Sequence, residues 1–204
     1  MPKANPEKIV GVVVGMDIPA MNDFIGGFCQ VCHEKGVQVL IGYPESFTDS
    51  AKAKEIALNM YKQGADVVWQ VAGGAGLGVF EAAAEMDRYS FGVDNDQTIA
   101  LSGQPALAAT IVTSFYKDCG ASVKYAVDCL LAGNYPTGAE TLGIAKGAVG
   151  LIKNQQYTDM VPKAIQDEID VELSKVANGE VSVISALFDN AAWEDIKAKA
   201  TAAQ

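Results

Sequence analysis

The fold of this chain is decided by residues 64–97, which read GADVVWQVAGGAGLGVFEAAAEMDRYSFGVDNDQ. An apolar strand pattern enters a glycine-rich turn, a helix pattern leaves it, and the next strand pattern ends on two carboxylates and an amide. In a parallel α/β sheet, ligands bind at the carboxyl ends of the strands, where helix N-termini and loop side chains converge. The stretch therefore predicts half of a small-molecule site.

The same alternation extends to both sides of this stretch. Runs of apolar and β-branched residues predict buried strands at 9–15, 37–41, 66–71, 89–93 and 109–115. Amphipathic helix patterns separate the first four strands, and they lie at 19–36, 49–64 and 77–86. Strands that alternate with helices of this length form βαβ units. The predicted fold class is therefore α/β, with a parallel sheet flanked by helices.

The second half of the chain has a less regular pattern. We expect helices over 119–131, 158–177 and 193–200, and short strands over 140–145, 148–152 and 181–184.

Composition excludes several classes of function. Of the 204 residues, 50% are hydrophobic and 20% are charged, which is typical of a globular chain with one large or two small domains. The formal net charge is −10 and basic residues do not form runs, so neither nucleic acid nor an anionic membrane surface is an expected partner. No apolar run approaches the roughly 18 residues of a membrane-spanning helix.

The first residues, MPKANPEKIVGVVVG, do not have the pattern of a signal peptide. The chain is therefore expected to be cytosolic, or to have lost an export signal. Four cysteines do not make a disulfide framework in a chain of this size. Cys119 and Cys129 lie about 15 Å apart along one expected helix, which is too far for a bridge. We expect both to be small buried hydrophobic residues.

Residues 29–33, CQVCH, match the C-x-x-C-H pattern of c-type haem attachment. The pattern lies inside an amphipathic helix, where Cys32 faces the expected core, so ordinary helix residues are the favoured interpretation. Haem attachment and a C-x-x-C redox role are the alternatives. His33 is the only histidine, so this chain alone does not build a Ser-His-Asp triad or a multi-histidine metal site around it. We expect His33 at the surface.

The turn at residues 73–78, GGAGLG, follows a strand and opens a helix, as a dinucleotide fingerprint does. It is not G-x-G-x-x-G, because Val79 stands in place of the third glycine, and it follows the third strand rather than the first. Such a turn still presents backbone N–H groups and the helix dipole to a polar ligand. A backbone donor to a ligand is favoured, and a nicotinamide cofactor site and a simple tight turn stay open.

Two side chains at strand ends are candidate ligand contacts. Asp94 ends an apolar strand, and a carboxylate there can accept hydrogen bonds from the vicinal hydroxyls of a sugar. The alternative is an Asx turn that caps the next segment. Phe47 lies in the loop after the second strand, where an aromatic ring either stacks on a ligand or fills the loop against the core. Spacing alone does not separate these two roles.

Taken together, these motifs resemble the basic membrane protein family of solute-binding lipoproteins, whose studied members are purine-nucleoside receptors of ABC importers. The resemblance spans residues 8 to about 152. It is carried, in this order, by the blocks GVVVGMDIPAMNDFIGGF (11–28), SFTDSAKAKEIALNMYKQGADVV (46–68), VAGGAGLGVFEAAAE (71–85), FGVDNDQ (91–97) and TSFYKDCGASV (113–123).

The resemblance implies a type I periplasmic-binding fold that holds a nucleoside between two lobes. Phe47 would stack on the base, Gly73 would lend a backbone contact, Asp94 would bind the ribose hydroxyls and Lys117 would complete the pocket wall. The family implies no catalytic residue, cofactor or metal.

The resemblance also implies how the chain is divided. Residues 8–115 would form a ligand-binding lobe, mainly the C-terminal lobe of the family, and residues 116–204 would return to complete it together with part of the first lobe. Family members carry a whole lobe before the segment that begins here at Lys8. The expected partners are therefore the nucleoside, an ABC permease, and a second copy or a separate N-terminal lobe. The implied location is the cell envelope.

Three functions stay open from the sequence. The leading one is that of a solute-binding protein that binds a nucleoside for import or sensing without catalysis. The second is a nucleotide-cofactor oxidoreductase that uses GGAGLG. The third is a degenerate lobe that serves only as an interaction module.

Overall fold

The computed structural model describes residues 7–138 and 140–202. In this part of the chain, six strands form one mixed sheet with the order β2-β1-β3-β4-β5-β6. The sixth strand, β6 (Val149–Leu151), runs antiparallel to its neighbour β5. The parallel strands are β1 (Ile9–Val14), β2 (Gln38–Gly42), β3 (Ala65–Val71), β4 (Tyr89–Asp94) and β5 (Ile111–Lys117). The predicted α/β class with a parallel sheet is confirmed.

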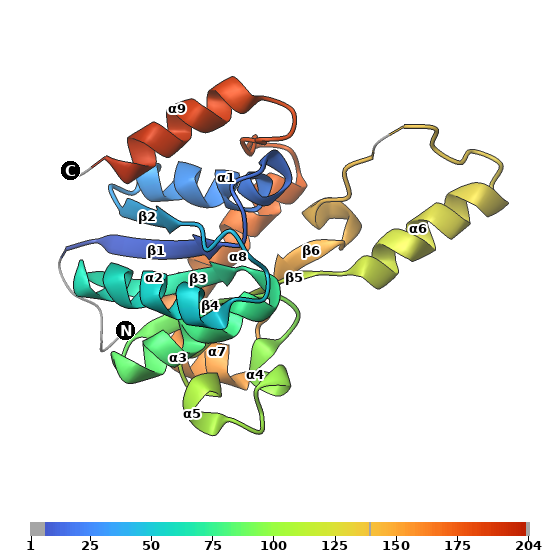
Figure 1. The fold of residues 1–204 in the computed structure, drawn as a ribbon. Helices are drawn as coiled ribbons and strands as arrows, with labels where there is room; N and C mark the ends of the chain where they lie inside the picture. Colours follow the sequence, from blue (N-terminus) through green and yellow to red (C-terminus); the bar gives the residue numbers. More distant parts are fainter. Residues whose placement is uncertain (1–6, 139, 203–204) are drawn as a thin grey trace.

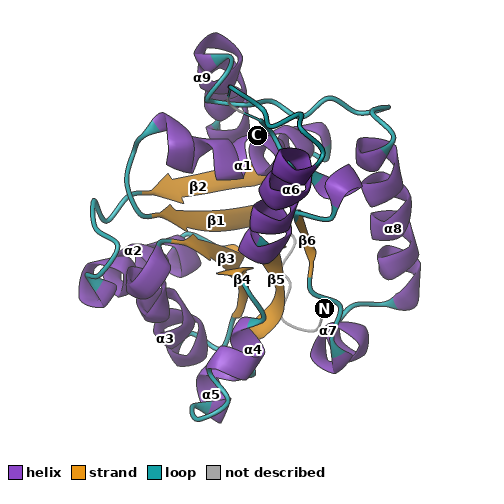
Figure 2. Ribbon diagram, turned by 90° about the vertical axis from the view of Figure 1, so that its right-hand side faces the viewer, coloured by secondary structure: helices purple, strands orange, loops and turns teal. Residues whose placement is uncertain are grey.

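Helices cover both faces of the sheet (Figure 2). On one face, α1 (Pro19–Glu34) packs with α9 (Asn190–Thr201). On the other face, α2 (Ser50–Lys62) packs with α3 (Leu77–Glu85). The sheet is thus the middle of three layers, as expected when parallel strands are joined by helical crossovers.

The side chains of β1 pack alternately into the apolar clusters on the two faces of the sheet. Val12 and Val14 join the apolar cluster under α1 and α9, whereas Val13 joins the cluster under α2 and α3. This alternation follows from the two-residue period of a strand. Trp193 is fully buried in the first cluster and fixes α9 to the sheet.

Local signals in the sequence set the ends of α2. The Asp49 carboxylate accepts a hydrogen bond from the Lys52 N–H at 3.0 Å, which is an N-cap contact typical of aspartate. Gly64 follows the helix with φ of +99°, a left-handed conformation that favours glycine. A side-chain acceptor therefore begins this helix, and the glycine lets the chain turn directly into β3.

The expected helix over 158–177 is wrong in its extent, because it is two helices. They are α7 (Gln155–Met160) and α8 (Lys163–Ala177). Between them Val161 takes φ of −100° and ψ of 122°, since the ring of Pro162 disfavours the helical conformation in the residue before it. Proline also has no N–H to donate within a helix.

Two expected short strands do not form. Residues 140–143 have no regular structure and are followed by the 3₁₀ turn η2 (Ile144–Lys146), and no strand of the described chain pairs with them. Residues 181–184 bond instead to α1, where the Gln30 carboxamide pairs with Ser182 O and Ile184 N at 3.2 Å each. The short helices α4 (Gln97–Ala100) and α5 (Pro105–Ala108) were not expected from the sequence.

One segment stands away from the rest of the molecule. This segment, called the arm below, consists of α6 (Cys119–Leu131) and the described residues up to 143, and it projects beyond the end of β5 (Figure 1). The turn that follows it, η2, lies against α8 (Lys163–Ala177). No residue of α6 is buried. Its apolar residues at helical spacing, here called the stripe, are between 47% and 81% exposed, and they are Val123, Val127, Leu130 and Leu131.

The position of the arm corrects the expectation for two cysteines. Cys119 is exposed and Cys129 is only partly buried, so neither is a core residue. Both lie on α6, which stands clear of the sheet layers, and helical periodicity alone does not show whether an apolar face meets a neighbour.

Candidate functional site

The parallel strands β1–β5 all end at one edge of the sheet, called the carboxyl edge below. Each residue that the resemblance assigns to the ligand lies there. Phe47 is in the loop after β2, and Gly73 begins the 3₁₀ turn η1 (Gly73–Gly76) after β3. Asp94 ends β4 and Lys117 ends β5. The chain therefore gathers these residues from four successive strand ends.

Phe47 is anchored through its backbone and packed through its ring. Its C=O accepts a hydrogen bond from the Ala75 N–H at 2.9 Å, and the Ser46 N–H donates to Gly15 O at 2.9 Å. The ring lies directly on Gly15, where an added Cβ would be 2.3 Å from the ring carbon Cε1. Phe47 as a whole nevertheless stays 37% exposed. The ring thus fills the loop against the end of β1 and still offers part of its surface to a ligand.

Asp94 and Lys117 form an ion pair at the carboxyl edge. The Lys117 ammonium lies 3.1 Å from the Asp94 carboxylate, and the two side chains are 45% and 48% exposed. The same ammonium lies 5.1 Å from the centroid of the Phe24 ring on α1. A half-exposed pair of this kind contributes about 0–1 kcal/mol to stability. Its partners can therefore be exchanged for a ligand at small cost.

The next carboxylate in the sequence, Asp96, has a structural role. It accepts hydrogen bonds from the Thr98 N–H at 3.0 Å and from the Asn154 amide at 2.9 Å, so it is Asp96 that caps α4. Burial alone would raise the pKa of Asp96, but the hydrogen bonds from Thr98 and Asn154 outweigh it and lower that pKa below its usual value. The Asx-type cap that the sequence offered as an alternative for Asp94 is made by Asp96.

The backbone at Asp94 is unusual. Its φ is +69°, and Glu45 in the loop before Phe47 has φ of +55°. Non-glycine residues adopt this conformation at a cost, and such residues cluster at ligand-binding sites. Aspartate tolerates it better than most side chains. Two acidic residues with positive φ thus lie near the carboxyl edge, Glu45 in the loop after β2 and Asp94 at the end of β4.

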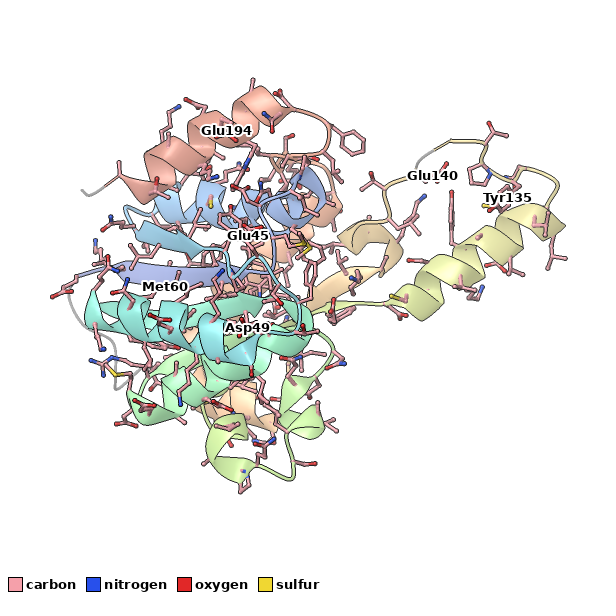
Figure 3. The ribbon with its side chains drawn as sticks, viewed as in Figure 1. Glu45, Asp49, Met60, Tyr135, Glu140 and Glu194 are labelled. Atoms are coloured by element: carbon pink, nitrogen blue, oxygen red, sulfur yellow. The ribbon has the colours of Figure 1, made fainter. Side chains whose placement is uncertain are left out.

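Figure 3 shows Glu45 and Asp49 on the main body, and Tyr135 and Glu140 out on the arm.

The glycines of GGAGLG have packing reasons. Gly73 has φ of +55°. An added Cβ on Gly76 would lie 2.0 Å from the Gln70 Oε1 atom, and one on Gly78 would lie 2.0 Å from the Ser50 carbonyl oxygen. The turn therefore needs glycine to contact a buried amide and the backbone of α2. These contacts account for the motif without a dinucleotide.

The CQVCH motif lies within α1. Cys29 is fully buried, and Cys32 is packed against the same core, as its place in the periodicity predicted. Burial raises the pKa of both thiols to about 12, so both are protonated near neutral pH and are poor nucleophiles and metal ligands. His33 is exposed, as expected. The motif behaves as ordinary helix residues.

Residues 7–138 and 140–202 form neither a candidate metal cluster nor a candidate membrane-spanning helix. No group of three or more His, Cys, Asp and Glu side chains there is placed to hold a metal ion. In the same residues, no helix combines the length and the apolar content required to cross a membrane.

Sequence reasoning missed two residues that shape the edge. Phe24 belongs to a helix face that periodicity assigns to the core, and its contact with Lys117 depends on how α1 crosses the end of β5. Gln70 is fully buried in the strand sequence VVWQV. A polar residue in an otherwise apolar buried strand is itself a signal, because buried polar groups require partners.

Comparison with known proteins then identifies the family. The family model of the PnrA-like ABC transporter substrate-binding proteins, called Bmp, matches residues 3–186. The chain belongs to this family. A relative from Lactococcus lactis subsp. cremoris, named "ABC transporter nucleoside-binding protein BmpA", is 33% identical over 84% of this chain and 54% of its own length. "Basic membrane protein A1" of Borrelia garinii subsp. bavariensis is 33% identical over 73% of this chain and 43% of its own length.

Solved structures agree on the fold of this Bmp-family chain. An ABC transporter solute-binding protein from Aeropyrum pernix K1 aligns with a TM-score of 0.70 and 24% identity, over 94% of this chain and 62% of that one. A transcriptional activator of the comK gene from Bacillus halodurans aligns with a TM-score of 0.71 and 20% identity, over 85% and 57%. The chain spans about half the length of the curated relatives it matches.

Proposed function

We propose that this Bmp-family chain serves as the substrate-binding component of an ABC importer and binds a nucleoside of the purine type. The observation that carries the proposal is the grouping of Phe47, Gly73 and the Asp94–Lys117 ion pair at one edge. An exposed aromatic face suits a flat base. A carboxylate on a half-exposed ion pair suits a pair of ribose hydroxyls.

The relatives support this ligand class. The Lactococcus lactis relative carries nucleoside binding in its name and matches most of this chain. Under the proposal, residues 8–115 supply one wall of the site and residues 116–204 lead to a second lobe that supplies the other wall. The partners are then the nucleoside, the permease of the importer and that lobe, which is part of the same protein, a separate chain or a second copy. The location is the cell envelope.

We propose binding without catalysis because the histidine and the two cysteines of CQVCH do not supply a base or a reactive thiol at the edge. His33 is exposed near the end of α1, and the thiols of Cys29 and Cys32 have raised pKa values. The rival function as a nucleotide-cofactor oxidoreductase would have to use GGAGLG. In that turn, the positions of Gly76 and Gly78 are already occupied by contacts within the protein.

A thermal-shift panel tests the proposal. The full chain is melted with adenosine, guanosine, inosine, uridine, free ribose, NADH and NADPH. A ligand at 100 times its dissociation constant stabilises a protein by about 2.7 kcal/mol, which corresponds to roughly 5–10 °C for a chain of this size. We expect the purine nucleosides to raise the melting temperature and the dinucleotides to leave it unchanged.

Each other outcome of the panel contradicts the proposal in a defined way. A shift with NADH or NADPH alone supports the oxidoreductase. A shift with uridine as large as that with adenosine removes the purine preference but keeps nucleoside binding. No shift with any compound supports the interaction module, in which the fold is kept and the ligand site is lost.

A further inference from the structure

Behind the carboxyl edge, a buried amide connects two of its turns. Gln70 is fully buried on β3. Its Oε1 atom accepts a hydrogen bond from the Ala72 N–H at 3.2 Å, and its Nε2 atom donates to Gln97 Oε1 at 2.6 Å. The Gln97 N–H in turn donates to Ser114 Oγ on β5 at 3.3 Å. The contacts form one chain from the end of β3 across to β5.

The chemistry of these groups fixes the direction of the hydrogen bonds. A backbone N–H can only donate, so the Gln70 atom that faces Ala72 must be the oxygen. Its NH₂ group then faces Gln97, which must present its own oxygen. Both carboxamides are thereby held in one orientation.

The link stands where the strand ladder has stopped. β3 and β4 pair from Val67 with Tyr89 to Trp69 with Phe91, although β3 continues to Val71 and β4 to Asp94. At the last ladder pair and one residue beyond it, two side chains on opposite faces of β3 span the strands. The Trp69 indole N–H donates to Gly92 O at 3.0 Å, and Gln70 donates to Gln97.

The ends of this link adjoin the residues of the candidate site. Ala72 directly precedes Gly73, and Gln97 lies three residues after Asp94. The residues around the link are so closely packed that two glycines beside it have no room for a Cβ atom. An added Cβ on Gly76 would be 2.0 Å from Gln70 Oε1, and one on Gly92 would be 2.3 Å from Ser114 Oγ.

We propose that Gln70 is a positioning residue that holds the turn bearing Gly73 and the turn bearing Asp94 at a fixed separation. Its consequence for affinity rests on the proposed function, whereas the coupling of the two turns does not. Neither Gln70 nor Gln97 needs to touch the ligand for this role. Without the link, the ends of β3 and β4 beyond their ladder keep the Trp69–Gly92 hydrogen bond but lose the bond between Gln70 and Gln97, so the two turns can move apart and a ligand that contacts both must restore their spacing.

Amide hydrogen exchange of the ligand-free chain, followed residue by residue by NMR, tests the coupling. In Gln70→Met, which keeps the size of the side chain but removes both hydrogen bonds, we expect exchange at the Gln97 N–H to speed up about tenfold. In Gln97→Met, we expect a similar change at the Ala72 N–H. Each substitution is thus read at the opposite turn. Gln63→Met is the control, because Gln63 is exposed and bonds only within its own helix turn.

The outcomes separate this inference from the proposed function. If each variant changes exchange only at its own turn, Gln70 does not couple the turns and the inference fails. If Gln70→Met does not fold, Gln97→Met decides the question by the same measurement, since Gln97 is only partly buried. If exchange changes at both turns but no nucleoside binds, the coupling stands and the proposed function fails. If nucleosides bind, we expect Gln70→Met to weaken their affinity about tenfold and Gln63→Met to leave it unchanged.

Discussion

Replacing Asp94 by asparagine should separate ligand affinity from stability. Asparagine keeps the shape of the side chain, removes its charge and tolerates the φ of +69° found at this position. Alanine would add backbone strain of roughly 1–2 kcal/mol in this conformation, so it is the less clean variant. The ion pair that is lost is half exposed, so its loss should cost at most about 1 kcal/mol. The melting temperature of the free protein should therefore fall by no more than roughly 2–4 °C.

The effect on ligand binding should be much larger. Hydrogen bonds to a charged group contribute about 1.5–3 kcal/mol, so the affinity for a nucleoside should fall roughly 10- to 150-fold by calorimetry. Asp195→Asn is the matched control, because Asp195 is also an exposed carboxylate paired with a lysine but lies on α9. The reasoning is refuted if Asp94→Asn binds as tightly as the parent, or if Asp195→Asn weakens binding equally.

Three further results are expected. Trp193→Ala should lower the free energy of unfolding, measured in urea, by about 3–5 kcal/mol because the ring is fully buried. Leu187→Ala, at an exposed site, is the control and should change that free energy by less than about 0.5 kcal/mol. Similar losses in both variants would contradict the burial argument. The stripe is an exposed apolar surface, so light scattering at micromolar concentration should show that the parent self-associates and that Val127→Asp is monomeric. A monomeric parent would rule out self-association through the stripe. The free energy of unfolding should fall as pH rises from 9 toward 12, by about 1.4 kcal/mol per pH unit for each of Cys29 and Cys32. The reason is that both thiols have raised pKa values in the folded protein, so the unfolded state loses these protons at a lower pH. A flat profile in the parent, or the same slope in the double serine variant, would refute this.

The strands and helices that follow from periodicity agree with the structure where neighbouring elements supply the burial. The run over 9–15 became β1, and the pattern from Asp49 to Gly64 became α2, which Asp49 caps and Gly64 follows. The segment over 140–145 contains strand-forming residues, but no strand of the described chain pairs with it, and strand formation depends on a partner. Pro162 was visible in the sequence, and its effect on the helix over 158–177 follows from its ring alone.

Some features of the candidate site could be predicted from the sequence, and others depend on tertiary structure. Asp94 and Phe47 could be selected from the sequence because strand ends and loops next to glycine-rich turns are where ligands bind. The contacts of Lys117 with Asp94 and Phe24 could not, because they depend on the register of β4 against β5 and on the course of α1. The hydrogen bond between Gln70 and Gln97 also depends on tertiary structure. A buried glutamine predicts that hydrogen-bond partners exist, but the sequence does not identify them.

The attachment of the arm has a mechanical consequence. Two chain segments enter the arm side by side, since Lys117 pairs with Val149 and the Asp118 N–H donates to Ala148 O at 2.7 Å. The arm is therefore joined to the sheet by two hydrogen-bonded stretches of chain rather than by one. Lys117 is the last residue before this joint, and its ammonium lies 3.1 Å from Asp94. A displacement of the arm at this joint would therefore shift the backbone that carries one partner of the ion pair at the carboxyl edge.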